Sequence, residues 1–446
     1  MTKTKKTRGP SLIALAFAGA SYLLGGAAQA QSLVELYESA RAFDATYLSA
    51  RLQYEANLSR AAQSRAGILP NAGLSANASR NESDNSANAA LNRSFNSQSA
   101  TLSAAQPLYR PGNWAGYEQG KKQVELAQAQ LEAAEQDLIV RTSQTYFDVL
   151  AAQDSLTFVR AQKAAVNEQL AFARRNFEVG ASTITDTREA QARFDLVTAQ
   201  EIAAENDLLV RRLALDQLVG RANTQPRGLI VPVALPPVLP ADVNAWVSQS
   251  EGVHPSIRQA RSAVEIADLE VTRAEAGHKP TLDLVASLNA ARNPTSQTVG
   301  ARTENASVGL ALNLPLFAGF ATQNRVRETL SLSERARSDL EGARRNVAQG
   351  TRSAFYGVVS GQGQVKALEA AELSSQSALE ANRLGYQVGV RINIDVLNAQ
   401  SQLFQTKRDL ARARYDVLVG GLRLRQANGT LTPQDLQQIN TLLLPR

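Results

Sequence analysis

The chain has 446 residues with 47 lysines and arginines, 41 aspartates and glutamates, two histidines and no cysteine. Without cysteine, a disulfide framework and a lipid-modified cysteine anchor are excluded, and His254 and His278 lack the spacing of a metal-binding motif. No nucleophile with its base can be assembled, so we expect neither an enzyme nor a cofactor. The net charge of +6 is largely due to the amino terminus and gives no reason to expect nucleic-acid binding.

The first 30 residues have the composition of a secretory signal peptide. A basic head is followed by an apolar stretch at 12–24 and by Ala28-Gln29-Ala30, a typical cleavage site. We therefore expect an exported protein that starts at Gln31 and has a formal charge of +2, since four cations are removed. No later apolar run reaches the length of about 18 residues that a membrane helix needs, so we expect any membrane crossing to use strands.

Alternating apolar and polar residues predict two pairs of strands, at about 67–112 and 277–318. Each strand has about ten residues, the length that crosses a bilayer when the strand is tilted. The polar segments 79–98 and 291–304 between the paired strands are predicted to be loops on the outer cell surface. Four strands are too few to close a barrel, for which about eight are needed, and open sheet edges are costly in lipid. Other copies of the chain must therefore complete the barrel.

Long segments without proline predict two helical hairpins, at about 114–220 and 320–428. In the first hairpin a mostly apolar stripe from Val124 to Phe177 advances by three or four residues at a time, the spacing of a coiled coil. A proline-rich segment at 226–242 is the predicted linker between the two halves of the chain. The last residues, 441–446, are predicted to form a C-terminal tail.

Sequence landmarks recur in the second half of the chain at a nearly constant offset. The stretch FEVGASTITD at 177–186 recurs as YQVGVRINID at 386–395, and LSAAQPLYRPG recurs as LALNLPLFAGF. A constant offset indicates an internal duplication, with repeats predicted at 31–225 and 243–440. Each repeat combines a strand pair with a long helical hairpin, so the predicted fold class is α+β.

Each hairpin is predicted to turn at a Val-Gly pair. Gly180 and Gly389 supply the positive φ that ends a helix, and an Asp follows six residues after each glycine. The simplest role for Asp186 and Asp395 is to cap the next helix at its amino terminus. Asp186 and Glu189 have the spacing of a capping box.

These features together resemble the TolC family, and the resemblance covers essentially the whole mature chain. It lies in the two VGxxxxxDxxxAQ turns, in the strand ends QPLY and LPLF, and in the closing ANGTLTPQDL. It implies the non-lipidated branch of the family, whose members are outer-membrane channel-tunnels for efflux and type I protein secretion. The resemblance implies a homotrimer in outer-membrane lipid, with a shared transmembrane β-barrel and a long periplasmic α-barrel. The implied partners are a periplasmic adaptor (membrane fusion) protein and an inner-membrane transporter of the ABC or RND type.

The resemblance also implies a gate at the periplasmic mouth, where the hairpin tips meet. Tyr386 and Arg391 are expected to hold Asp186 and keep the mouth shut, through charge-assisted hydrogen bonds that a partner can break. Copies of Asp395 are expected to form an acidic constriction in the pore. The best-known members carry a second Asp where this chain has Asn398, so we expect weaker cation binding here.

A second hypothesis is a periplasmic coiled-coil adaptor or scaffold protein. Such proteins usually carry one hairpin beside β domains, whereas this chain has duplicated hairpins and strands of bilayer length. The sequence therefore favours a passive exit duct that is gated at its inner mouth. It leaves open whether the cargo is a drug or a secreted polypeptide, and which pump and adaptor serve the duct.

Overall fold

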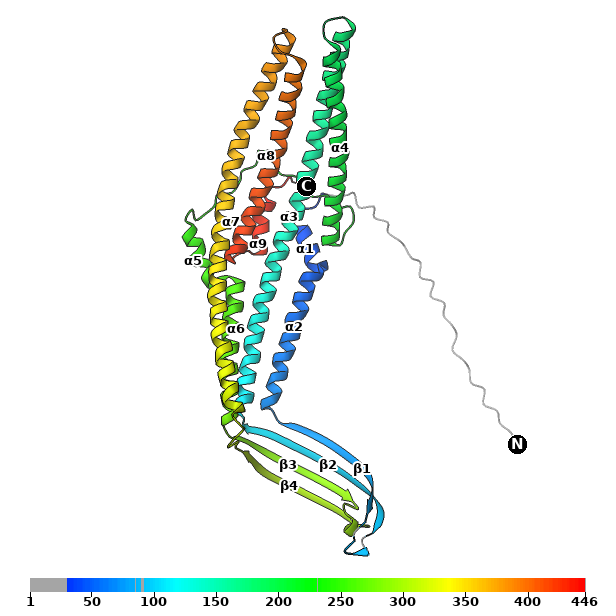
Figure 1. Ribbon diagram of the computed structural model, residues 1–446, viewed down its shortest axis with the longest axis vertical. Coiled ribbons are helices and arrows are strands. Elements are labelled where there is room, and N and C mark those ends of the chain that lie inside the picture. Colours follow the sequence, from blue (N-terminus) through cyan, green and yellow to red (C-terminus); the bar gives the residue numbers. More distant parts are fainter. Residues whose placement is uncertain (1–29, 85, 90–91, 231, 446) are drawn as a thin grey trace, which may run out of the picture.

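The computed structural model describes residues 30–445, except 85, 90–91 and 231. The chain is elongated, with a four-stranded sheet at one end and the tips of two helical hairpins at the other (Figure 1). The predicted signal peptide at 1–30 lies outside the described residues apart from Ala30. In the described part of the chain, no helix is both long enough and apolar enough to span a membrane.

The two halves of the chain fold into the same series of elements. The first half consists of α1 (Leu33–Phe43), α2 (Ala45–Arg65), the 3-10 turn η1 (Ala66–Ile68), β1 (Asn71–Ser83), β2 (Arg93–Tyr109), α3 (Pro111–Glu178) and α4 (Ile184–Val219). The second half consists of α5 (Val243–Val253), α6 (Pro255–Glu275), η3 (Ala276–His278), β3 (Thr281–Arg292), η4 (Ser296–Thr298), β4 (Arg302–Asn313), α7 (Ala321–Gln387) and α8 (Asn393–Asn428), followed by α9 (Pro433–Asn440). Equivalent helices and strands start 209 or 210 residues apart, which confirms the predicted duplication and the α+β class.

The sheet is antiparallel throughout, in the order β1-β2-β3-β4, so the pairing of β2 with β3 joins the two halves of the chain. Leu102 of β2 lies opposite both Leu74 of β1 and Leu288 of β3. The register shifts between Pro107 and Tyr109, where the proline has no N–H to donate to the ladder. Immediately after this irregularity β2 ends and α3 begins, so the sheet leads directly into the helical hairpins.

The predicted loops between the paired strands are shorter in the structure. β1 and β2 occupy most of the segment 79–98, and β3 and β4 enter the segment 291–304 from both sides. The polar residues of these segments pair across the strands, as Asn81 does when its amide donates to the hydroxyl of Ser97 at 2.6 Å. A run of serines and asparagines has the composition of a loop, but here it forms strand ends that are polar on one face.

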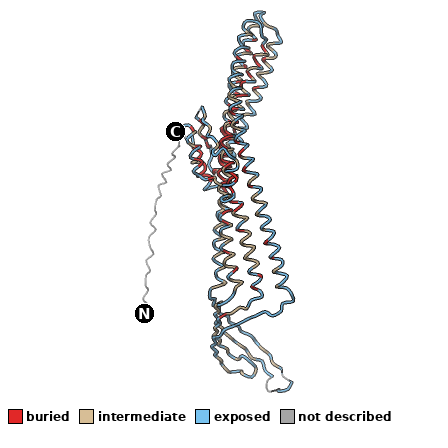
Figure 2. Tube along the Cα trace, turned by 90° about the vertical axis from the view of Figure 1, so that its left-hand side faces the viewer, coloured by how far each residue is buried: buried red, intermediate tan, exposed pale blue. Residues whose placement is uncertain are grey.

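The two helical hairpins run the length of the molecule beyond the sheet (Figure 1). α3 has 68 residues and α7 has 67, so at a rise of 1.5 Å per residue each is about 100 Å long. α3 packs against α4 of its own hairpin and against α8 of the other. The short helices α1, α5 and α9 lie around the middle of the long helices, where burial is greatest, and the sheet is largely exposed (Figure 2).

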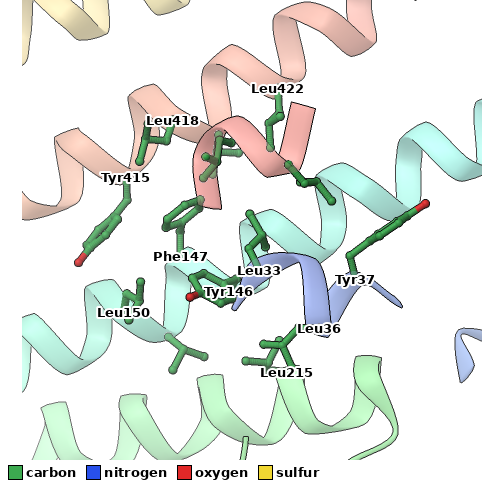
Figure 3. Close-up of a cluster of buried hydrophobic side chains, with 14 of the residues drawn as sticks. Leu33, Leu36, Tyr37, Tyr146, Phe147, Leu150, Leu215, Tyr415, Leu418 and Leu422 are labelled. Carbon is green, nitrogen blue, oxygen red and sulfur yellow. The ribbon is translucent and has the colours of Figure 1, made fainter. Parts of the chain in front are cut away.

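The main hydrophobic core lies where α1 and α9 pack against the long helices (Figure 3). Tyr146 of α3 is buried there, and its hydroxyl donates to the backbone carbonyl of Arg227 at 2.8 Å. Leu229 of the proline-rich segment pairs with Leu443 of the C-terminal tail, and both are buried. The segment between the halves and the tail therefore contribute to this core, which holds both hairpins at their midpoint.

Candidate gate at the hairpin tips

Each hairpin tip turns at a glycine in the left-handed conformation, with φ of 76° at Gly180 and 75° at Gly389. Beyond Gly180, the N–H of Ala181 donates to the carbonyl of Asn176 at 2.7 Å, which satisfies the last turn of α3. The second tip has the same arrangement of hydrogen bonds. A side chain at φ near 75° is strained, so glycine at both turns follows from the geometry.

Asp186 belongs to a capping box at the start of α4. Its carboxylate accepts hydrogen bonds from the backbone N–H of Thr183 at 3.1 Å and from the Thr183 hydroxyl at 3.0 Å, and its own N–H donates to that hydroxyl at 3.3 Å. The prediction that Asp186 forms a capping box with Glu189 is therefore wrong, since Thr183 is the N-cap and Asp186 is the third helical residue. Thr183 takes this place because its short hydroxyl reaches an N–H three residues ahead.

Asp395 holds the equivalent position in α8, but among the described residues it has no capping partner of the kind that Thr183 provides for Asp186. The N-cap of α8 is Ile392, whose side chain accepts no hydrogen bond. The carboxylate of Asp395 lies 3.7 Å from the guanidinium of Arg391, one helical turn earlier, and both side chains are partly exposed. Within one chain, Arg391 thus contacts Asp395, and the structure does not bring it onto Asp186.

Tyr386 lies at the end of α7 and faces the tip of the first hairpin. Its ring packs edge-on against Phe172 of α3, with ring centroids 5.9 Å apart. Burial raises the pKa of its hydroxyl, the negative charge of Asp186 raises it further, and the side chain of Asn176 lowers it. Among the described residues, the buried hydroxyl has no hydrogen bond of good geometry. Tyr386 therefore presents an unused hydroxyl within electrostatic reach of Asp186.

Asn393, which was not among the predicted gate residues, ties the two tips together. It is the first residue of α8 and is fully buried. Its Oδ1 accepts a hydrogen bond from the amide of Gln169 in α3 at 2.5 Å, and its Nδ2 donates to the backbone carbonyl of Asp186 at 3.1 Å. The first repeat has the apolar Ile184 at the equivalent position. This difference between the repeats is the sequence signal that could have pointed to Asn393.

A second polar bond between the hairpins lies one turn further along α8. The guanidinium of Arg193 in α4 donates to Oδ1 of Asn398 at 2.9 Å. At Asn398 the resemblance implies that this chain lacks a negative charge that other family members carry. In the structure the amide oxygen of Asn398 accepts the hydrogen bond from Arg193 of the first hairpin. In the part of the chain that the structure describes, no group of three histidines or carboxylates is placed to hold a metal ion. The chemistry of the tips is thus that of breakable polar contacts between two hairpins.

Comparison with known proteins agrees with this architecture. The sequence pattern of the family described as Outer membrane efflux protein matches residues 36–221 and 246–430, one match in each repeat. The chain is 34% identical to the outer membrane protein TolC of Vibrio cholerae, over 96% of this chain and 98% of that protein. It is 32% identical to the alkaline protease secretion protein AprF of Pseudomonas aeruginosa, over 94% of this chain and 88% of that protein.

A solved structure shows the same fold. The outer membrane protein VceC of Vibrio cholerae superimposes with a TM-score of 0.78 at 19% identity, over 89% of this chain and 96% of that one. The repeat architecture, the two family matches and the full-length relatives agree with one another. The chain therefore belongs to the outer membrane efflux protein family, the family of TolC, and is an exit duct of the outer membrane for efflux or type I secretion.

Proposed function

We propose that three copies of this chain form a passive duct, closed at its periplasmic mouth by the hairpin tips and opened there by a partner. The observation that carries the proposal is the difference between the two faces of the sheet. Residues that pair across neighbouring strands share a face, so the register sorts the side chains into two sets. The duct model requires one set to suit lipid and the other to suit water.

Between its polar end rows, one face of the sheet carries alanine, leucine and valine apart from Gln106: Ala72, Leu74, Ala76, Ala100, Leu102, Ala104, Leu284, Ala286, Leu288, Val308, Leu310 and Leu312. The other face carries mostly small polar residues, among which Gly73, Ala105, Val285, Ala291, Gly309 and Ala311 also lie: Asn71, Ser75, Asn77, Ser99, Thr101, Ser103, Ser287, Asn289, Asn305 and Ser307. The apolar set is not covered by the chain, since the three β4 side chains of that set are 66–78% exposed. An apolar face opposite a polar one is the pattern of strands in a transmembrane barrel.

The edges of the sheet support assembly from several copies. β1 and β4 are the outer strands, and within the chain each pairs on one side only. In lipid every unpaired backbone group costs several kcal/mol, and about eight strands are the fewest that close a barrel. Three copies supply enough strands when β4 of each copy pairs with β1 of the next. This closure leaves the apolar face toward lipid and the polar face toward the lumen.

Aromatic side chains support the position of the membrane boundary. Tyr109, Trp114, Phe317 and Phe320 lie where the sheet joins the long helices, and all four are exposed. Aromatic residues gather at membrane–water interfaces because one part of the ring system suits lipid and another suits water. The helices beyond this belt extend into the periplasm in our proposal. The second hypothesis, a periplasmic adaptor, does not explain the exposed apolar face, because an adaptor in water would have to cover it.

The tips are the part of the duct that a partner must reach. The relatives' names point to both uses of such a duct, since AprF is named for alkaline protease secretion and the family for efflux. We propose that a periplasmic adaptor protein docks on the hairpins and links the trimer to an inner-membrane transporter of the ABC or RND type. The duct itself is passive, so all the energy comes from that transporter.

We further propose that Tyr386, Arg391, Asp186 and Asp395 form the gate. The hydroxyl of Tyr386 is buried without a well-formed hydrogen bond among the described residues, and the charge of Asp186 acts on it, so we propose that a shift of the tips brings the two into contact. In the single chain the guanidinium of Arg391 lies 3.7 Å from the carboxylate of Asp395, which is a long and partly exposed ion pair. Such a pair is weak, so Arg391 can readily leave Asp395 for another carboxylate. Arg391 can therefore move to Asp186 when copies assemble and release Asp395 to the pore.

The two faces of the sheet give the sharpest test of the proposal. Val308 and Ser307 are neighbours on β4 that point to opposite faces. Val308→Lys places a charge in lipid, which costs about 2–4 kcal/mol per chain near the bilayer midplane, whereas Ser307→Lys places it in the lumen. We expect Val308→Lys to abolish the heat-modifiable oligomer in outer-membrane fractions, and Ser307→Lys to assemble and change pore conductance. Equal tolerance of both substitutions contradicts the proposed orientation of the sheet.

A further inference from the structure

Three arginines lie on the apolar face of the sheet, at the end away from the helices. By the register, Arg292 of β3 is directly opposite Arg302 of β4. Arg80 of β1 lies on the same face, two residues beyond Ala78, which shares a row with Gln98 and Arg292. All three arginines are exposed. The apolar face thus ends in a group of three arginines, with Arg292 and Arg302 in one row and Arg80 one row beyond.

The charges of these three arginines are incompletely balanced within the described chain. Like charges directly opposite one another destabilise a sheet, and Arg292 and Arg302 are such a pair. Glu304 bonds to Arg302 at 2.6 Å, with both side chains well exposed, and Glu82 lies beyond Arg80 on the same face. Among the described residues Arg292 has neither an ion pair nor a hydrogen bond from its side chain. An anion between Arg292 and Arg302 removes the repulsion.

Beside the arginines the sheet is hollowed. A cavity of about 460 Å³ is lined on this face by Ala76, Ala78, Ala100, Ala290, Gln98, Arg292 and Arg302, and also by Asn77, Ser99 and Ala291, which the register assigns to the other face. The alanines leave this space because the leucines of the same face lie nearer the helices. A guanidinium binds phosphate through two parallel hydrogen bonds, and the alanine floor suits a hydrocarbon chain. The cavity therefore places two guanidinium groups beside an alanine-lined surface.

We propose that this site binds a phosphorylated, acylated lipid of the outer leaflet, with its phosphate between Arg292 and Arg302 and an acyl chain along the alanines. The assignment rests on the proposed orientation of the sheet, in which this end lies farthest from the periplasm (Figure 1). A free phosphate ion can make the same hydrogen bonds to the arginines as the lipid headgroup, but it has no apolar part to contact the alanines. The lipid fills both parts of the site at once.

The test is native mass spectrometry of the mature oligomer in detergent, titrated with diphosphoryl lipid A or with the same acylated disaccharide stripped of phosphate. The double variant Arg292→Gln with Arg302→Gln should bind diphosphoryl lipid A about tenfold or more weakly, since each arginine–phosphate contact is charge-assisted. Arg93→Gln is the matched control, because Arg93 is at the same end of the sheet but on the opposite face. It should bind like the unaltered protein, and the dephosphorylated probe should not distinguish the variants.

The outcomes separate this inference from the proposed function. Equal binding of diphosphoryl lipid A by the double variant and the unaltered oligomer overturns the site, and so does equal binding of the two probes. If millimolar inorganic phosphate displaces bound diphosphoryl lipid A as effectively as added lipid does, the lipid assignment is overturned. If the double variant fails to assemble, Arg292→Lys takes its place, because it keeps the charge but loses the two-bond geometry and should still weaken binding. An oligomer that inserts and conducts but ignores these substitutions leaves the duct intact and refutes the lipid site alone.

Discussion

Replacing Asn393 with Ala should loosen the closed mouth, because it removes both hydrogen bonds that tie the start of α8 to the first hairpin. Each neutral hydrogen bond contributes about 0.5–1.5 kcal/mol net, so the loss is about 1–3 kcal/mol per chain. Since about 1.4 kcal/mol corresponds to a factor of ten, the relative population of the open state should rise about five- to hundredfold. In single-channel recordings across planar bilayers, the variant should open more often than the unaltered protein at the same voltage.

Asn382→Ala is the matched control for this experiment. The amide of Asn382 donates to the carbonyl of Ala378 in its own helix at 2.9 Å, so its removal leaves the contact between hairpins unchanged. Gln169→Ala removes one of the two bonds and should have an intermediate effect. The double variant of Gln169 and Asn393 should open little more than Asn393→Ala, since they share a bond. If Asn393→Ala opens no more often than Asn382→Ala, these bonds do not hold the mouth and the reasoning is refuted.

Other predictions concern the gate, the core and the outer surface. Tyr386→Phe combined with Arg391→Ser gives the second tip the side chains of the first and should raise single-channel conductance; an unchanged conductance places the gate elsewhere. Asp395→Asn should lower cation selectivity, measured as the reversal potential in a salt gradient, with little effect on opening. Burial raises the pKa of Asp154, so folded stability falls as pH rises above the unfolded value of about 3.9. Asp154→Asn keeps an acceptor for the hydroxyl of Tyr415, and its thermal stability should not show this fall with rising pH. Equal pH dependence of the variant and the unaltered protein refutes the assignment of the fall to Asp154. An epitope tag within 84–92 should be labelled on intact cells; labelling only after disruption of the outer membrane reverses the topology.

The helices and the duplication were predictable because their signals are local and repeat along the chain. The apolar stripe of the first hairpin is buried as expected at Leu138, Val166 and Ala173, where α3 packs on other helices. At its end Phe177 is 43% exposed, because the hairpin tip has fewer neighbours within one chain. The extent of the strands was not predictable from composition. A strand that faces water on one side uses the same serines and asparagines as a loop.

The tip glycines were predictable for a similar reason, since a positive φ favours glycine wherever a helix must turn back. The contacts between the hairpins were not, because they depend on how far one hairpin slides along the other. Asn393 therefore reads in sequence as an ordinary first helical residue, and only packing shows that it is buried between Gln169 and Asp186. The capping box of Asp186 was misassigned because two residues near it, Thr183 and Glu189, satisfy the spacing equally well.

The central claim is that one chain supplies only part of a membrane-spanning barrel, since β1 and β4 each keep an open edge. The mass of the purified mature protein in detergent, measured by light scattering with the detergent contribution subtracted, tests this claim most directly. We predict the mass of three chains, stable until the sample is heated. A stable monomer that inserts into lipid bilayers contradicts the account, because four strands alone leave both edges of the sheet unpaired in the membrane.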